Sequence, residues 1–330
     1  MDHEPSSVVI AGMGGSGIVA EVVSDVASEK DSSVQIRALK DYHLPRDVDR
    51  ASVVIGVSYS GNTEETLGVL HEAAQRGIKG YTFGSGGLIE AFSKKNSGYK
   101  FTRTAMLKVP RSSLPGILFP VLRLLSASKI INLGEEEVAE AFGAMEAVKA
   151  NAGDLHNPEF NPSLSIGTAL NRADPCPLVY SSRRTRSVGL RFRQSLNENA
   201  KMHAFDGTVP ELCHNEIVGW DLAASRAIGR GTTAAAPTSV LLKLDDDPEE
   251  LRIRFEILRD IISKSDGRTI DAPFQGASYF AKIMSMLYSL DYATYFTSIL
   301  RQVDPILTPS IDLLKKELQS RLDYLKRFGG

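Results

Sequence analysis

The chain has 330 residues, of which 42% are hydrophobic and 24% are charged, and its net charge is −2. A single hydrophobic core rarely serves more than about 250–300 residues, so this length favours two domains of roughly 150 residues each. The balanced charge argues against the broad basic face of a nucleic-acid-binding protein, and the hydrophobic fraction excludes disordered and fibrous classes.

Cysteine usage and the apolar stretches indicate where the protein resides. Two cysteines, Cys176 and Cys213, cannot form a disulfide framework or a four-ligand zinc site. The longest apolar stretch, around residues 116–125, is shorter than the about 20 residues of a membrane span, and it contains Pro120 and Arg123. The N-terminus lacks the profile of a signal peptide. We therefore expect a soluble, cytoplasmic protein that binds neither membranes nor nucleic acid.

Up to about residue 150, short apolar runs alternate with helical patterns. The predicted strands cover residues 8–11, 34–39, 53–57 and 80–83. The predicted helices cover residues 18–27, 64–75 and 135–150. Continuous apolar strands separated by helices indicate a parallel sheet that is covered on both faces.

A polar stretch with two prolines, residues 151–173, predicts the boundary between two domains. Beyond it the alternating pattern restarts. Strands are predicted at residues 177–180, 240–244 and 269–270, and helices at 187–200 and 249–263, followed by a long helix that runs through Leu300 and a final helix that begins near Pro309. We therefore expect two α/β domains, residues 1–150 and residues 151–330, with the final helix in the second.

The first predicted strand runs into the glycine loop, Gly12-Met-Gly-Gly-Ser-Gly17. Its glycines permit a tight turn, and amides at the start of the following helix attract anions by about 0.3–1 kcal/mol from the helix dipole. The same residues satisfy the dinucleotide fingerprint, in which Asp41 would take the ribose hydroxyl. A tight turn that serves packing alone is a third interpretation.

A second loop at the same edge of the sheet is rich in hydroxyl groups. It is the serine loop, Ser58-Tyr-Ser-Gly-Asn-Thr63, and it opens the next helix. A helix cap needs one of the hydroxyls at 58, 60 and 63, so three of them favour a phosphate site over simple capping. A dinucleotide site does not explain this loop, and no lysine has the spacing of a P-loop.

Glu198 and His214 are candidates for moving protons. Glu198 lies in Asn197-Glu-Asn-Ala-Lys201 at the end of a predicted helix, where a general base contributes about 10²–10⁴-fold in rate. The alternative is a solvated glutamate paired with Lys201. His214 lies in the loop Pro210-Glu-Leu-Cys-His-Asn215, where a lone histidine is often structural, and no spacing of ligands predicts a metal site.

Two basic residues complete the candidates. Arg111 follows Pro110 in a loop at the end of the first domain, where it would stabilise a developing oxyanion or bond a carbonyl oxygen. Lys315 lies seven residues after Thr308, about two helical turns away on the same side of the final helix. The alternative for Lys315 is an exposed helical lysine.

The glycine loop and the serine loop, the latter continued by Glu-Glu-Thr, resemble the sugar isomerase (SIS) domain. Three later motifs narrow the resemblance: Asn197-Glu-Asn-Ala-Lys201, Pro210-Glu-Leu-Cys-His-Asn215 and Leu307-Thr-Pro-Ser-Ile-Asp-Leu-Leu-Lys315. Their order and spacing are similar to those of archaeal-type bifunctional phosphoglucose/phosphomannose isomerases. The resemblance runs from about residue 8 to residue 325.

This resemblance implies a fold and a reaction. It implies two tandem SIS domains, each a parallel sheet flanked by helices in the flavodoxin-like manner, with a C-terminal helix. The family interconverts glucose 6-phosphate and mannose 6-phosphate with fructose 6-phosphate through a cis-enediol, with no metal and no cofactor. It also implies a homodimer with the active site at the interface, because the counterpart of His214 comes from the neighbouring subunit.

The resemblance further assigns roles to residues around the reacting carbons. Glu198 would carry the proton between C1 and C2, and Gly15 and Ser16 would contact the sugar near these carbons. Arg111 would lie close to the enediolate. Aldose–ketose isomerisation needs such a base and such a positive charge on chemical grounds.

The remaining roles concern the phosphate, the ring and the choice of epimer. Ser58, Ser60 and Thr63 would bind the phosphate. His214 and Lys315 would act on the ring oxygen and O1 during ring opening. The small side chain of Thr308 would leave room for either C2 epimer, and Cys213 stands where the family often has a second histidine.

Two other functions compete with this interpretation. A regulator that senses a sugar phosphate through an SIS domain needs only the phosphate loop, so the presence of Glu198, His214, Arg111 and Lys315 together counts against it. A nucleotide-dependent dehydrogenase would use only the glycine loop.

Overall fold

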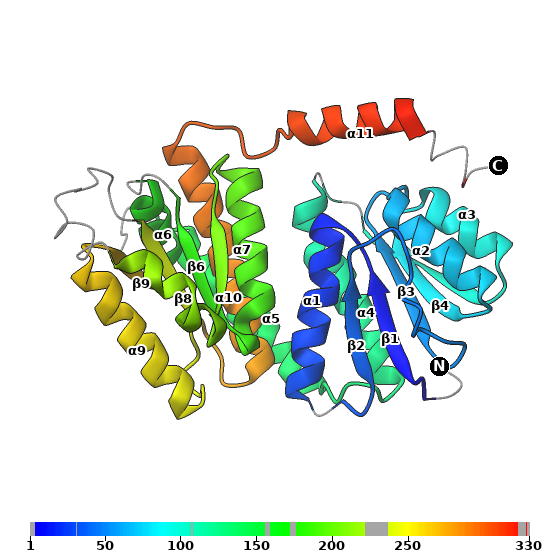
Figure 1. The fold of residues 1–330 in the computed structure, drawn as a ribbon, viewed down its shortest axis with the longest axis horizontal. Coiled ribbons are helices and arrows are strands. Elements are labelled where there is room, and N and C mark those ends of the chain that lie inside the picture. The colour runs from blue at the N-terminus through cyan, green and yellow to red at the C-terminus, as the bar shows by residue number, and fades with distance from the viewer. Residues whose placement is uncertain are drawn as a thin grey trace. The chain divides into compact units, whose positions relative to one another are not determined.

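The computed structural model describes residues 4–30, 32–105, 107, 109–155, 159–171, 176–221, 237–322 and 328. The chain forms two compact units (Figure 1). The first comprises Met1–Gly134 together with Thr308–Gly330, and the second comprises Glu135–Leu307. Within the described part of the chain, no helix is long and apolar enough to cross a membrane.

The first unit is built on a five-stranded parallel sheet with the order β2-β1-β3-β4-β5. The strands are β1 (Ser7–Ala11), β2 (Gln35–Leu39), β3 (Val53–Ser58), β4 (Lys79–Gly84) and β5 (Tyr99–Arg103). Val9 lies opposite Val54, and Ile10 lies opposite Ile55. These β-branched residues are buried on both faces of the sheet, which is why the central strands are continuous apolar runs.

Helices cover both faces of this sheet because β2 is added on one side of β1 and the later strands are added on the other side. The helices are α1 (Gly14–Glu29), α2 (Glu64–Gln75), α3 (Gly87–Lys95), a short 3-10 helix η1 (Pro110–Ser113) and α4 (Leu114–Ala127). Right-handed crossovers that move outward from β1 in opposite directions place α1 on one face and α2 with α3 on the other. Leu67 and Phe92, from α2 and α3, share a buried cluster with Val9 and Val54 of the sheet.

The second unit repeats this design with one strand fewer among the described residues: its parallel sheet has the order β7-β6-β8-β9. The strands are β6 (Leu178–Ser182), β7 (Phe205–Val209), β8 (Thr238–Leu242) and β9 (Arg268–Asp271). The helices are α5 (Glu135–Ala152), α6 (Pro162–Asn171), α7 (Arg186–Asn199), α9 (Glu249–Lys264) and α10 (Tyr279–Leu300), with 3-10 helices η2 (Arg183–Thr185), η3 (Glu211–His214) and η4 (Glu216–Trp220). The α/β class and the two flanked parallel sheets are confirmed.

The long helix α10 is the centre of the second unit's helical layer. It packs against α5, α6 and α7. Its buried residues lie all around the helix and include the serines and threonines at 285, 289, 294, 297 and 298. Because three helices surround it, α10 lacks the one-sided apolar pattern of a surface helix.

Besides the short 3-10 helices, five elements escaped the sequence-based prediction: the helices α3, α4 and α6 and the edge strands β5 and β7. The edge strands β5 and β7 carry polar, partly exposed residues, in contrast to the apolar central strands. Helix α6 lies inside the polar stretch that predicts a domain boundary; Pro162 begins it, and Ile166 and Leu170 are buried.

The compact units also divide the chain at other places than the predicted domains, 1–150 and 151–330. Helix α5 belongs to the second unit because it packs along α10. The C-terminal helix α11 (Pro309–Leu322) and the residues after it belong to the first unit. There the ring of Phe328 stacks on His71 of α2, with 4.9 Å between the ring centroids.

Candidate active site

The glycine loop and the serine loop flank the point where the strand order of the first sheet reverses. Strand β1 has β2 on one side and β3 on the other, and the two loops follow β1 and β3. In open α/β sheets, ligands bind in the crevice at the carboxyl ends of such strands. The topology therefore places both predicted loops at the edge where a ligand site is expected.

The glycine loop brings its backbone very close to the neighbouring strand. A Cβ atom on Gly12 would lie 3.0 Å from the carbonyl oxygens of Ser16 and Val57, and Gly14 has a positive φ of 52°. Helix α1 starts at Gly14 without a side-chain cap hydrogen bond from Met13. Glycine is required here because a side chain would separate the loop from β3.

The hydroxyl of Ser16 joins the two loops. It accepts a hydrogen bond of 3.1 Å from the backbone N–H of Tyr59 in the serine loop. Ser16 is buried, and it lies in the first turn of α1. This bond holds the start of α1 and the serine loop in one fixed arrangement.

Inside the serine loop, the hydroxyls also bond to one another and to the loop's own backbone. The Ser58 hydroxyl is 2.8 Å from the Thr63 hydroxyl, and it accepts a hydrogen bond of 3.1 Å from the N–H of Gly61. The exposed Ser60 hydroxyl accepts from the N–H of Asn62 at 3.2 Å. The mutual bond between Ser58 and Thr63 uses one of the two hydroxyl protons, so the other proton can be donated to a ligand.

The helix that follows the serine loop begins without a side-chain cap. Thr63 occupies the N-cap position of α2 and makes no side-chain cap hydrogen bond. The backbone N–H of Leu67 donates to the Thr63 carbonyl oxygen at 3.0 Å, which closes the first helical turn. The earlier N–H groups of this turn have no partner within the helix itself, which is the arrangement that binds anions at helix N-termini.

A third loop, which the sequence analysis missed, supports the serine loop. It is Gly84-Ser-Gly-Gly87 between β4 and α3. The Ser85 hydroxyl donates to the Tyr59 carbonyl oxygen at 2.7 Å, and the N–H of Leu88 donates to the Asn62 side chain at 3.0 Å. A Cβ atom on Gly61, where φ is +73°, would lie 1.8 Å from the Gly86 carbonyl oxygen. The signal in the sequence was the glycine cluster at the end of a predicted strand.

Arg111 belongs to the same end of the first unit. It lies in η1, which packs against α1, and it is 5% exposed. The preceding segment meets the serine loop, because the Tyr59 hydroxyl donates to the Leu107 carbonyl oxygen. The first unit thus holds together the residues predicted to bind the phosphate and those predicted near the enediolate, which are Gly15, Ser16, Ser58, Ser60, Thr63 and Arg111.

Glu198 and His214 belong to the second unit. Glu198 is half-buried in the last turn of α7, and the Lys201 amine donates to its main-chain carbonyl oxygen. His214 is exposed in η3, which is a 3-10 helix where the sequence indicates a loop. Its neighbour Cys213 packs against the buried cluster that contains Tyr180, so the two side chains face different surroundings.

Thr308 and Lys315 belong to the C-terminal helix of the first unit. The Thr308 carbonyl oxygen accepts hydrogen bonds from the N–H groups of Ile311 at 3.0 Å and Asp312 at 3.2 Å, so Thr308 begins helix α11. Lys315 is exposed two turns further along, as the spacing predicts.

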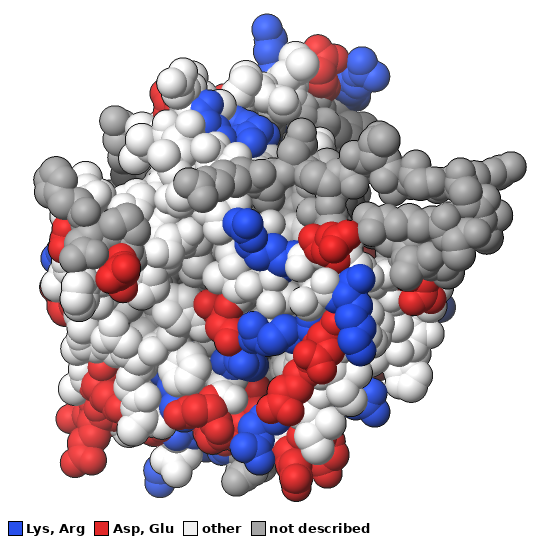
Figure 2. Space-filling view, turned by 90° about the vertical axis from the view of Figure 1, so that its left-hand side faces the viewer, with Lys and Arg blue, Asp and Glu red and all other residues white. Residues whose placement is uncertain are grey.

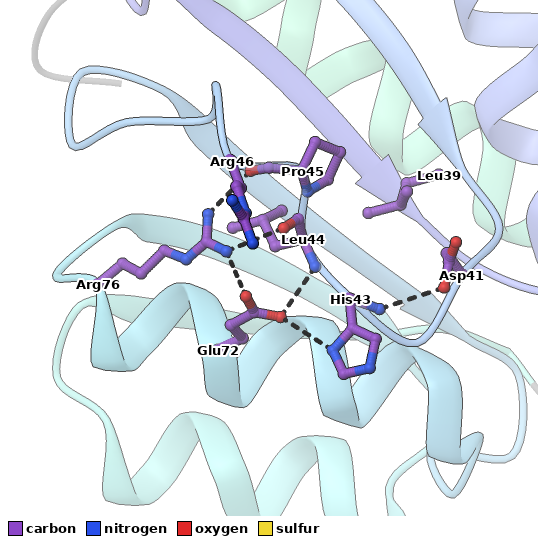
Figure 3. Close-up of a pocket in the computed structure, with 8 residues that line it drawn as sticks. All are labelled: Leu39, Asp41, His43, Leu44, Pro45, Arg46, Glu72 and Arg76. Carbon is purple, nitrogen blue, oxygen red and sulfur yellow. Dashed lines mark hydrogen bonds and ion pairs between the residues drawn. The ribbon is translucent and has the colours of Figure 1, made fainter.

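A separate hollow of about 450 Å³ lies beside β2 in the first unit (Figure 3). Glu72 and Arg76 of α2 hold its wall: the Leu44 N–H donates to Glu72 at 2.9 Å, and Arg76 donates to the carbonyl oxygens of Leu44 and Pro45 at 2.9 and 2.8 Å. Burial raises the pKa of Glu72, but the Leu44 N–H and Arg76 outweigh burial and hold that pKa below its usual value. These polar groups therefore bond the backbone of the segment after β2.

Asp41, the residue that a dinucleotide site would use, also lines this hollow. Its carboxylate accepts hydrogen bonds from the N–H groups of Tyr42 at 2.6 Å and His43 at 3.4 Å, so it shapes the turn after β2. On the face of the molecule in Figure 2, Lys and Arg lie side by side with Asp and Glu. Among the described residues, no three His, Cys, Asp or Glu side chains are grouped as a metal site would require.

Comparisons with known proteins agree with this architecture. Residues 161–318 match the model of the bacterial phospho-glucose isomerase C-terminal SIS domain. The bifunctional phosphoglucose/phosphomannose isomerase of Thermoplasma acidophilum is 31% identical over 95% of this chain and 90% of its own length. That of Aquifex aeolicus is 30% identical over 94% of this chain and 90% of its own length.

A solved structure extends the similarity to the fold. A protein from Thermus thermophilus that is described as hypothetical superposes with a TM-score of 0.71 at 18% identity, over 96% of this chain and 84% of its own. The curated relatives match nearly the whole chain, across both units. The chain therefore belongs to the family of bifunctional phosphoglucose/phosphomannose isomerases and is an isomerase with SIS domains.

Proposed function

We propose that this isomerase interconverts glucose 6-phosphate and mannose 6-phosphate with fructose 6-phosphate through a cis-enediol intermediate. The observation that carries the proposal is the serine loop at the strand-order reversal of the first sheet, followed by the uncapped start of α2. A dianionic phosphate is the ligand that such a site suits best. The full-length similarity to bifunctional isomerases supports the rest of the reaction.

In this proposal the phosphate anchors the substrate in the first unit. Ser60 and Thr63 donate hydroxyl protons to it, and the first-turn amides of α2 donate N–H groups. Ser58 is fully buried and bonds both Thr63 and Gly61, so it also sets the shape of the phosphate loop. Binding energy from this remote group holds the sugar while the proton moves.

The proton transfer is assigned to Glu198. Its carboxylate removes the proton from C2 of the open-chain aldose and returns it to C1, while a proton passes from O2 to O1, which gives the ketose. Arg111 stabilises the negative oxygen of the enediolate, and Gly15 and Ser16 contact the sugar near these carbons. Every step uses groups of the protein itself, so the proposed reaction needs no cofactor.

Ring opening and epimer choice are assigned to three other residues. His214 and Lys315 exchange protons with the ring oxygen and O1, and both side chains are exposed on their own subunit. The small side chain of Thr308 leaves room for either configuration at C2. In this proposal the enzyme accepts both epimers because no large side chain stands at position 308, and it needs no second set of contacts.

We further propose that the active site is completed in a homodimer, with His214 supplied by the partner subunit. One observation supports a dimer. No residue of α11 is buried, although Leu313, Leu314 and Ile311 lie on it. Large apolar side chains gathered on one exposed helix are typical of protein–protein contacts. We also propose a cytoplasmic location, which the free thiols of Cys176 and Cys213 fit.

The test adds fructose 6-phosphate to the purified protein in the presence of EDTA. Glucose 6-phosphate is followed with a coupled dehydrogenase, and mannose 6-phosphate is measured separately by chromatography. Both products are expected, and Glu198→Gln is expected to lose about 10²–10⁴-fold in kcat because the general base is gone. Glu250→Gln, at the start of α9, is the matched control and keeps full activity.

Each other result has a definite meaning. If glucose 6-phosphate is the sole product, the protein is an isomerase but the proposed role of Thr308 is refuted. If there is no turnover but fructose 6-phosphate still raises the melting temperature, catalysis is refuted and the protein is a sugar-phosphate-binding protein.

A further inference from the structure

A buried ion pair joins helices α7 and α10 close to Glu198. Arg191 is 3% exposed. Its Nε and Nη2 atoms donate to the two carboxylate oxygens of Asp291, at 3.1 and 3.0 Å. The Ser195 hydroxyl donates to the same carboxylate at 2.9 Å. A bidentate pair with a third hydrogen bond fixes both side chains in one geometry.

Glu198 lies on the face of α7 that carries this pair. Positions 191, 195 and 198 follow the spacing that places residues on one side of a helix. The end of α7 is attached to the region of α10 by two more bonds: the Asn199 side chain donates to Thr294 at 2.8 Å, and Arg301 donates to the Ala200 carbonyl oxygen at 3.1 Å. The last two turns of α7, including Glu198, are thus held against α10.

Electrostatics connects the pair to Glu198 as well. Burial lowers the pKa of the Arg191 guanidinium, but the carboxylate of Asp291 outweighs burial and raises that pKa. Glu198 and Tyr295 act in the same direction as Asp291. Coulombic attraction is mutual, so the positive charge of Arg191, which Asp291 balances, lies within reach of the Glu198 carboxylate.

We propose that Arg191 and Asp291 are positioning residues for the base Glu198: together they fix the end of α7 and balance the charge beside the Glu198 carboxylate. This inference rests on the proposed isomerase function and deepens it, because it names the groups that set the position and the electrostatic surroundings of Glu198. The Ser195 hydroxyl orients Asp291 in this arrangement.

Other charged and titratable groups lie on α7 and on the elements packed against it, and the test leaves them all unchanged. Arg193 of α7 forms an ion pair with Asp206 of β7, and Lys282 of α10 forms one with Asp245. The remaining groups are Arg186 on α7, Tyr180 on β6, Arg183 and Arg184 on η2, and Tyr279, Tyr288, Tyr292 and Tyr295 on α10, with Lys201 and His203 after α7 and Arg301 after α10.

The test compares Arg191→Gln with Asp291→Asn through the pH dependence of kcat for isomerisation of fructose 6-phosphate. Arg191→Gln leaves the negative charge of Asp291 unbalanced, which favours the protonated, inactive form of Glu198. The acid limb of the profile then moves to higher pH. Asp291→Asn leaves Arg191 unbalanced and moves that limb to lower pH. Each shift is expected to be about half a pH unit or more.

A purely structural role predicts a different result. Both single variants disrupt the bidentate pair between Arg191 and Asp291, so both lower the melting temperature. A structural role leaves the acid limb in place or moves it in the same direction in both variants. The double variant Arg191→Gln/Asp291→Asn restores neutrality and is expected to return the limb to the wild-type position. The melting temperature thus depends on the hydrogen bonds, whereas the pH of the acid limb depends on the net charge of the pair.

Charge-conserving variants keep the inference testable when a single variant does not fold. Arg191→Lys and Asp291→Glu preserve the charges but change the bidentate geometry. They are expected to lower kcat and to leave the acid limb within about 0.2 pH units of wild type. The inference is overturned when the acid limb of Arg191→Lys lies at the same pH as that of Arg191→Gln. It is equally overturned when the acid limb of Asp291→Glu lies at the same pH as that of Asp291→Asn.

The two proposals fail in distinguishable ways. A wild-type protein without isomerase activity refutes the proposed function. An active wild type whose single variants move the acid limb in the same direction, or leave it unmoved, refutes only the positioning role of Arg191 and Asp291.

Discussion

At the scale of single residues, the hydroxyl groups of the serine loop do two things at once. Ser58 is fully buried and bonds Thr63 and Gly61, whereas Ser60 is exposed. The pattern of hydroxyls in the sequence indicates a phosphate site, but it treats the three residues alike. The structure separates them, because the buried Ser58 hydroxyl holds the loop together while the Ser60 hydroxyl is exposed.

Thr63→Val tests the division between these hydroxyls. The substitution keeps the shape of the side chain but removes the bond to Ser58 and the proton that Thr63 donates to phosphate in the proposed site. We expect KM for fructose 6-phosphate to rise about tenfold or more, with a smaller change in kcat, because the phosphate is bound in both the ground state and the transition state. Steady-state kinetics measures both constants.

The control for this prediction is Thr102→Val on the edge strand β5, where the threonine is exposed and distant in sequence from the loop. It is expected to leave both constants unchanged. A Thr63→Val variant with wild-type KM would show that its hydroxyl does not contact the phosphate.

At the scale of elements, the loops that support the site depend on partners from other elements. Gly84-Ser-Gly-Gly87 touches the serine loop only because β4 lies beside β3 in the sheet. In the same way, the segment after β2 is held by Glu72 and Arg76 of α2. Such contacts join residues far apart in the chain, so the local sequence pattern cannot reveal them.

The role of Glu72 predicts how stability depends on pH. Its pKa is lowered in the folded protein, because the Leu44 N–H and Arg76 outweigh burial. A carboxyl group with a lowered pKa contributes stability above its unfolded pKa, and this contribution is lost as the pH falls through the folded value. We expect Glu72→Gln to cost about 1–3 kcal/mol of unfolding free energy at pH 7 and less at pH 4.

Urea unfolding of wild type and variant at the two pH values measures this difference. Glu146→Gln is the control, since Glu146 is exposed and its ion pair with Lys149 lies at the surface, where such pairs contribute little. A destabilisation by Glu72→Gln that is the same at pH 7 and pH 4 would contradict the electrostatic origin of the effect.

At the scale of the whole molecule, the residues that the proposed function uses are divided between the two units. Glu198 and His214 belong to the second unit, whereas the phosphate loops, Thr308 and Lys315 belong to the first. The proposed homodimer, in which the partner subunit supplies His214, predicts complementation between two inactive variants, because each supplies the group that the other lacks.

Glu198→Gln and His214→Ala homodimers are mixed, unfolded together and refolded. If His214 acts across the interface, random pairing restores one intact site in each mixed dimer, which gives about a quarter of wild-type activity. If His214 acts within its own subunit, no site is restored and the mixture stays inactive. Refolded wild type sets the reference for the yield.

Much of the fold and site follows from local pattern. The buried strands β1, β3, β6 and β8 are runs of apolar residues, so periodicity alone predicts them. The glycine loop, the serine loop and three later motifs predict the family that the comparisons confirm. The edge strands β5 and β7 escape prediction because half of their surroundings is solvent and their residues are correspondingly polar.

The sequence by itself thus determined the α/β class, the two loops that point to phosphate and the isomerase family. Each of these depends on residues that are neighbours in the chain or repeat at a regular spacing. Tertiary structure alone decided the strand order, the membership of α5 and α11 in the two units, and the pairing of Arg191 with Asp291. These features depend on contacts between residues that are far apart in the chain, such as Arg191 and Asp291, which are 100 positions apart. Such contacts form only when packed elements bring the residues together.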